Sequence, residues 1–158
     1  MRLSLALPLS ISLLLATPWA MAQSAAPAAF DAQRVGTFKQ VQGETWIGAA
    51  DARRAPTPGE GLREAERVST GQTGAATITL KDGTVLTLGP NTTVDLNKFQ
   101  FDATTQKGNF ALDLLQGSIR VVTGLLARIN PDLFKISTPT AVVGVRGTDF
   151  IVETQATQ

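Results

Sequence analysis

Aspartates are the side chains in this sequence best suited to chemistry, because histidine, cysteine and tyrosine are absent. Their absence excludes Ser-His-Asp and Cys-His catalysis and zinc sites built from His or Cys. Asp95, Asp102 and Asp113 could supply a pair of carboxylates for glycoside hydrolysis. Each falls on the polar face or at the end of an expected strand. We therefore interpret all three as solvated, and we expect no catalytic residue and no enzyme.

Asp82-Gly83-Thr84 could contribute to a calcium site, but no second carboxylate stands at the spacing of a calcium loop. Asp-Gly is also the strongest short signal for a β-hairpin, because a type I′ turn needs positive φ at both central residues. We predict a hairpin turn at Asp82 and Gly83, with no metal and no cofactor.

The segment 133–152 is the densest β-branched run in the chain and holds one arginine among apolar residues, Arg146. Alternation places Arg146 on the face opposite the neighbouring valines, so it needs a carboxylate or carbonyl partner. A ligand or partner site at Arg146-Gly147-Thr148 is one interpretation. The favoured one is an internal ion pair, with Gly147 allowing a bend. The candidate acids are Asp82, Asp95 and Asp113.

Strands must position these residues, because apolar and polar residues alternate through most of the chain. Turn signals separate about ten short strands. These signals include Gly43, Asp82-Gly83, Gly89-Pro90-Asn91, Gln116-Gly117 and Pro139. The sequence therefore predicts an all-β domain, and the pattern leaves a sandwich, a barrel and a β-solenoid open.

Two further features belong to this expected fold. Four phenylalanines stand on the apolar faces of their strands, so we expect core residues rather than a stacking surface. They are Phe99, Phe101, Phe110 and Phe134. A short helix is expected within 123–129, ended by Asn130-Pro131 because proline keeps the residue before it out of the helical conformation.

Residues 1–22 have the pattern of a secretory signal peptide. Arg2 precedes the apolar stretch 3–16, and Ala20-Met21-Ala22 is a small-x-small cleavage site. We predict cleavage after Ala22, a flexible mature N-terminus at 23–33 and a single domain at 34–158. The product is expected to be periplasmic or secreted, with no membrane span.

Charge limits the partners of this expected product. Loss of Arg2 with the leader leaves equal numbers of basic and acidic side chains. A nucleic-acid-binding protein would carry an excess of basic residues, so we expect no nucleic-acid partner. Simple electrostatic binding to a membrane is disfavoured for the same reason.

Four segments within 68–152 resemble the FecR domain, in the family's order. They are 69–84, 88–94, Leu115–Arg120 with Gly117 inside it, and 137–150. The last is similar to the family's hallmark, Thr-Pro-x-Ala-x-x-x-Val-Arg-Gly-Thr-x-Phe. Its matching residues are Thr138, Pro139, Ala141, Val145, Arg146, Gly147, Thr148 and Phe150. The resemblance implies a periplasmic all-β domain, with short strands in a twisted β-solenoid-like or two-sheet sandwich arrangement.

In the best-known members of that family the domain belongs to a membrane-bound anti-sigma regulator. Here a cleavable leader replaces the cytoplasmic segment and the membrane span, so the chain resembles stand-alone exported FecR-domain proteins. We expect a non-enzymatic domain that contacts another envelope protein, in signalling or assembly. Strand addition at an unpaired edge near 148–152 is the expected mode. The alternative is a small-molecule or glycan-binding β-module, with a concave apolar pocket and a few polar groups.

Overall fold

The computed structural model describes residues 33–49, 51–145 and 147–155. Within these ranges the chain forms eleven strands, one α-helix and one 3-10 helix. The all-β prediction is therefore confirmed. The expected signal peptide, almost all of the expected N-terminal segment and Arg146 lie outside the described residues.

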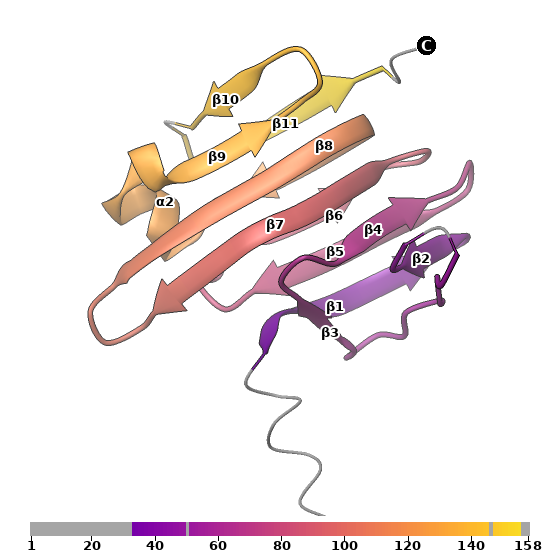
Figure 1. Ribbon diagram of the computed structural model, residues 1–158, viewed down its shortest axis with the longest axis horizontal. Helices are drawn as coiled ribbons and strands as arrows, with labels where there is room; N and C mark the ends of the chain where they lie inside the picture. Colours follow the sequence, from indigo (N-terminus) through magenta and orange to yellow (C-terminus); the bar gives the residue numbers. More distant parts are fainter. Residues whose placement is uncertain (1–32, 50, 146, 156–158) are drawn as a thin grey trace, which may run out of the picture.

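Six strands form one layer, in which each pairs antiparallel with its neighbours (Figure 1). In spatial order they are β3 (Gly61–Arg63), β1 (Arg34–Gln42), β5 (Ala75–Leu80), β6 (Val85–Leu88), β8 (Lys107–Val122) and β11 (Asp149–Thr154). β5 shows the rule that builds the layer: burial alternates at every residue, so Ala76, Ile78 and Leu80 face the core.

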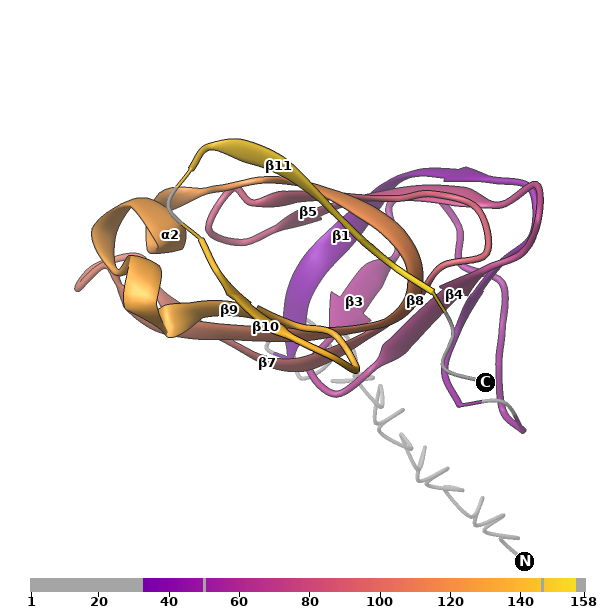
Figure 2. The same ribbon diagram turned by 90° about the horizontal axis from the view of Figure 1, so that it is seen from above.

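A second layer shares β8 with the first. In spatial order it contains β2 (Thr45–Ile47), β4 (Arg67–Thr70), β7 (Thr93–Asp102), β8, β9 (Phe134–Ser137) and β10 (Val142–Gly144). Figure 2 shows the two layers facing each other, which is a two-sheet sandwich.

A helical connection links the two layers at one end of the sandwich. The β8–β9 pair is parallel, and a parallel pair needs a crossover connection. The crossover is α2 (Leu125–Ile129) followed by the 3-10 helix η1 (Pro131–Leu133). The short helix predicted within 123–129 is thus confirmed, and Figure 2 shows it at the end of the sandwich.

β8 belongs to both layers, since its first half pairs with β7 and β9 and its second half with β6 and β11. Its buried side chains change phase, from even positions (110, 112, 114) to odd positions (119, 121). Gly117 lies between the two halves with a φ of +87°. The turn expected at Gln116-Gly117 is therefore wrong. The glycine bends a strand that continues, because each half keeps partners on both sides.

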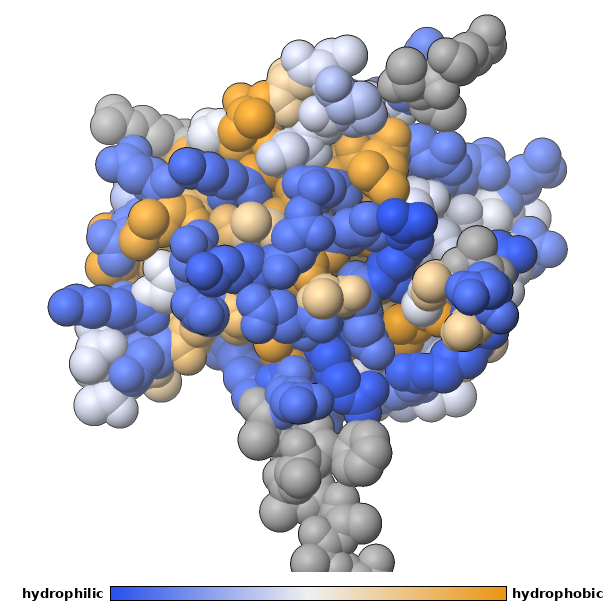
Figure 3. Space-filling model, in the orientation of Figure 1, coloured by the Kyte–Doolittle hydropathy of each residue, from blue (hydrophilic) through white to orange (hydrophobic). Residues whose placement is uncertain are grey.

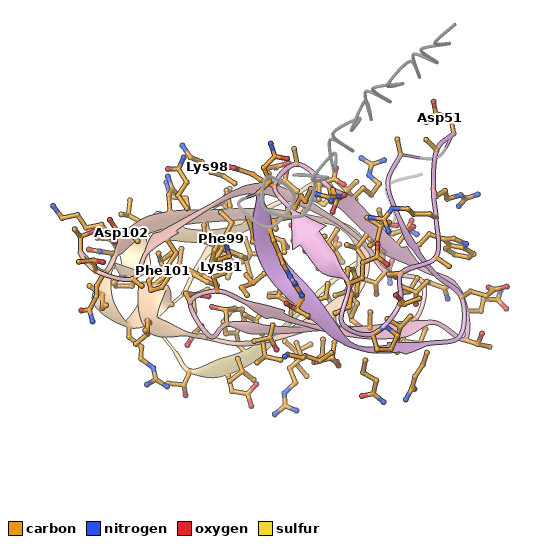
Figure 4. All side chains as sticks on the ribbon, turned by 90° about the horizontal axis from the view of Figure 1, so that it is seen from below. Asp51, Lys81, Lys98, Phe99, Phe101 and Asp102 are labelled. Carbon is orange, nitrogen blue, oxygen red and sulfur yellow. The ribbon has the colours of Figure 1, made fainter. Side chains whose placement is uncertain are left out.

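The core between the layers contains stacked phenylalanines. The rings of Phe110 and Phe134 stack with centroids 4.2 Å apart, and Phe99 meets Phe110 edge-on at 6.4 Å. All three are buried, which confirms their predicted role, while Phe101 is half-buried and packs against the same cluster. Figure 4 shows Phe99 and Phe101 pointing between the layers and Lys98 projecting outward.

The hairpin predicted at Asp82-Gly83 joins β5 and β6, but its turn is not type I′. Of the two residues only Gly83 has positive φ, at +85°. The Gly83 N–H donates to the Leu80 carbonyl at 3.0 Å, and the Leu80 N–H donates to the Thr84 carbonyl at 2.8 Å. The hairpin loop is therefore 81–83, and a loop of that length needs positive φ only at its last residue.

Asp82 holds this loop together from a buried position. Its carboxylate accepts hydrogen bonds from the Thr84 N–H (3.0 Å) and the Thr84 hydroxyl (2.7 Å). The Thr84 hydroxyl oxygen in turn accepts the Gly124 N–H at 3.0 Å. The Asp82 carbonyl accepts the Leu125 N–H at 2.9 Å. The hairpin loop therefore fixes the start of α2.

Candidate functional site

The C-terminal strands form a rim at which both layers end. Among the described residues β11 pairs only with β8, and β10 pairs only with β9. Each strand thus presents a main-chain edge, which is a template for pairing with another strand. Figure 1 shows both strands on the same side of the molecule, beyond β8, and Figure 2 shows them on opposite layers.

A groove of about 500 Å³ lies between β10 and β11. Its lining includes five apolar residues and two acids, namely Val143, Val145, Phe150, Ile151, Val152, Asp149 and Glu153. Ile151 is 64% exposed, and the neighbouring Val142 of β10 is 67% exposed. Figure 3 shows apolar surface along this rim, above a mostly hydrophilic sheet face.

Thr138 and Pro139, which the sequence singled out, form the tip of the β9–β10 hairpin. The Thr138 N–H donates to the Ala141 carbonyl at 2.7 Å, and the Ala141 N–H donates to the Thr138 hydroxyl oxygen at 3.1 Å. Pro139 is exposed and separates β9 from β10, as expected from a residue with no N–H to donate. Both residues shape the hairpin and neither lines the groove.

Gly147 and Thr148 fasten the start of β11 to β8. The Thr123 N–H donates to the Thr148 carbonyl at 2.9 Å, and the Thr123 hydroxyl donates to the Gly147 carbonyl at 2.9 Å. Phe150 is half-buried and packs against the core. Gly147 and Phe150 line the groove directly, so part of the predicted contact set lies at the rim.

The predicted ion pair of Arg146 lies outside the described residues and stays a prediction. The acids named as its partners have other bonds. Asp95 receives two hydrogen bonds from Arg67, both of 2.6 Å, and Asp113 receives one from the Asn97 amide at 2.6 Å. The Arg67 pKa is raised above its usual value, chiefly by the hydrogen bond to Asp95.

The structure brings together two of the three carboxylates considered for hydrolysis. Asp95 and Asp113 are directly opposite on β7 and β8, whereas Asp102 lies where β7 ends. The Asp102 pKa is lowered by backbone hydrogen bonds from Thr105 and Thr104. In the described part of the chain, no group of three or more acidic side chains is placed to hold a metal ion.

Sequence reasoning missed an ion pair on the outer face of β11. The Arg120 guanidinium binds the Asp149 carboxylate through two hydrogen bonds of 2.9 and 2.5 Å. Part of the signal was available, since Arg120 lies between buried Ile119 and Val121, but its pairing with Asp149 depends on the β8–β11 register. The hydrogen bonds from Arg120 lower the Asp149 pKa below its ordinary value.

This pairing predicts that β11 loosens in acid. A depressed carboxyl pKa stabilises the fold above the unfolded-state pKa, and this contribution is lost as pH falls through the folded value. Amide protection in β11 should therefore drop below about pH 4, measured by hydrogen exchange as protection factors. The Asp149→Asn variant should show lower protection at neutral pH and no acid step. An unchanged acid step in that variant would assign it to another group.

No helix in the described ranges is long and apolar enough to cross a membrane. A family model described as FecR protein matches residues 66–158, a range that begins just before β4 and includes the rim. No curated protein and no solved structure matches the chain. The family match extends over more than half of the sequence and confirms the resemblance carried by the four segments. The chain therefore belongs to the FecR protein family.

Proposed function

We propose that this FecR-family domain is a non-enzymatic contact module of the bacterial envelope, which binds another protein by adding a strand to β11. The family match supports a role connected with envelope signalling. The expected leader supports export, with the mature protein in the periplasm or secreted. The observation that carries the mode of contact is the outer edge of β11, which has no partner strand among the described residues.

The ladder geometry supports this role for β11. Thr148 is hydrogen-bonded to Thr123 at the start of the β8–β11 ladder. Bonded and non-bonded pairs alternate along an antiparallel ladder. Asp149, Ile151 and Glu153 therefore direct their N–H and C=O groups away from β8. Outward main-chain groups at every second residue are what an added strand needs.

The test is a proline at the outward position. Ile151→Pro removes one outward N–H and leaves the bonds to β8 in place, because proline is tolerated on an edge strand whose N–H faces solvent. A photoreactive residue replaces Gln155, which is exposed just after β11. In exporting cells we expect a crosslinked protein when the rest of the edge is wild type, and a loss of roughly ten-fold or more with Ile151→Pro. The measurement is the amount of crosslinked adduct divided by the amount of exported protein.

Ile151→Ala is the matched control, because it removes the side chain and keeps the N–H. It should retain most of the adduct. Val152→Pro should instead disturb the β8–β11 ladder and lower stability, which distinguishes loss of the edge from loss of the fold. Equal adduct in wild type and a folded Ile151→Pro variant would reject strand addition at β11.

A further inference from the structure

We propose that the strand added to β11 belongs to another protein and alternates apolar with basic side chains, with a Lys or Arg opposite Glu153. This inference rests on the proposed function and specifies its partner. It follows from the largely apolar groove along β11, from Glu153, which has no partner among the described residues, and from the clash of acids when a second copy pairs about Ile151.

The groove requires apolar residues at every second position of the partner. Directly opposite residues of paired strands point to the same face of a sheet. Partner residues opposite Phe150 and Val152 would therefore enter the groove of about 500 Å³. Its walls on the β10 side are Val143 and Val145, so apolar side chains entering it would be covered by both layers.

The outer face of β11 requires positive charge. Asp149, Ile151 and Glu153 are exposed on that face. Arg120 already binds Asp149, whereas the Glu153 carboxylate has no ion pair or hydrogen bond with any described residue. Opposite charges on directly opposite strand positions attract, and like charges repel. A basic residue of the partner opposite Glu153 would therefore form an ion pair with its carboxylate.

A second copy of this chain brings acids together when it pairs symmetrically about Ile151. If two β11 strands pair antiparallel with Ile151 at the two-fold axis, Asp149 of each copy lies opposite Glu153 of the other. Acids then face each other twice, and neither Glu153 gains a cation. A basic and apolar strand from a different protein meets both requirements.

The experiment measures binding of labelled peptides to the mature protein by fluorescence anisotropy. The probes are a peptide of alternating lysine and valine, its glutamate–valine counterpart, and a lysine–valine peptide of the same composition without alternation. We expect the alternating basic peptide to bind at least roughly ten-fold tighter than either of the others. Glu153→Lys should remove that preference or invert it, whereas Glu153→Gln should weaken it.

Asp51→Lys is the matched control, because it makes the same charge change on a distant loop (Figure 4) and should leave the preference intact. Ile151→Pro should abolish binding of the alternating peptides.

Equal affinity for basic and acidic peptides, with both lost in Ile151→Pro, would overturn the proposal of a basic partner and keep strand addition. Failure of the basic peptide to bind, or a dimer in sedimentation that Ile151→Pro dissolves, would also overturn it. Crosslinking at position 155 that is insensitive to Ile151→Pro would reject the proposed function itself.

Discussion

Replacement of Phe110 by alanine should lower the free energy of unfolding by about 3–5 kcal/mol, the range for truncating a large buried aromatic residue. Phe110 is fully buried, stacks on Phe134 and meets the edge of Phe99. Phe110 lies on β8, and its two ring partners lie on β9 and β7, so its side chain joins three adjacent strands of the second layer. Equilibrium denaturation of the mature protein measures the loss.

Phe101→Ala supplies the comparison for this prediction. Phe101 also points toward the core but is half-buried, so its truncation should lower the free energy of unfolding by less than about 2 kcal/mol. Phe110→Leu should lie between the two variants, because it keeps apolar volume and loses the stacked geometry. Equal losses for Phe110→Ala and Phe101→Ala would mean that the stack is not the centre of the core.

Local patterning was sufficient to predict the strands, because a strand with one buried face alternates at every second residue. β5 and β6 follow that rule, and the Asp-Gly signal located their hairpin. The type of turn was not predictable, because it follows from the length of the loop. The loop 81–83 is closed by the hydrogen bond from the Leu80 N–H to the Thr84 carbonyl, which the local sequence does not show. The same limit applies to β8: a glycine in a turn and a glycine in a bent strand have the same local sequence.

The hallmark segment identified the family and includes part of the rim. The contact residues that it suggested are not the ones on which the proposed contact at β11 depends. The sequence pattern singled out Arg146 as a charge among apolar residues, whereas the proposed contact edge of β11 depends on Ile151 and Glu153. Their role depends on β11 lying at an edge, and edge position follows from which strands pair. Alternation indicates which face of a strand is buried, and it does not indicate which edge is free.

Replacement of Gly117 by alanine should lower the free energy of unfolding by about 3 kcal/mol or more, combining backbone strain with a steric clash. Its φ of +87° is unfavourable for any residue with a side chain. An added Cβ would also lie 2.5 Å from the Thr92 Cα and 2.6 Å from the Asn91 carbonyl oxygen. Both contacts are with main chain, which cannot rotate away as the end of a flexible side chain can.

Gly83→Ala separates these two effects. Gly83 has nearly the same φ, +85°, but nothing lies within 4 Å of the Cβ that alanine would add. That variant should lose only about 1–2 kcal/mol, the strain of the left-handed conformation. The difference between the two losses in free energy of unfolding measures the clash at the point where β8 passes from one layer to the other.

Because Thr154 pairs with Gly117, relief of this clash should also displace the end of β11. Hydrogen exchange should therefore show protection lost in β11 for Gly117→Ala and kept for Gly83→Ala. Equal stability of the two variants would mean that the bend in β8 accepts a side chain.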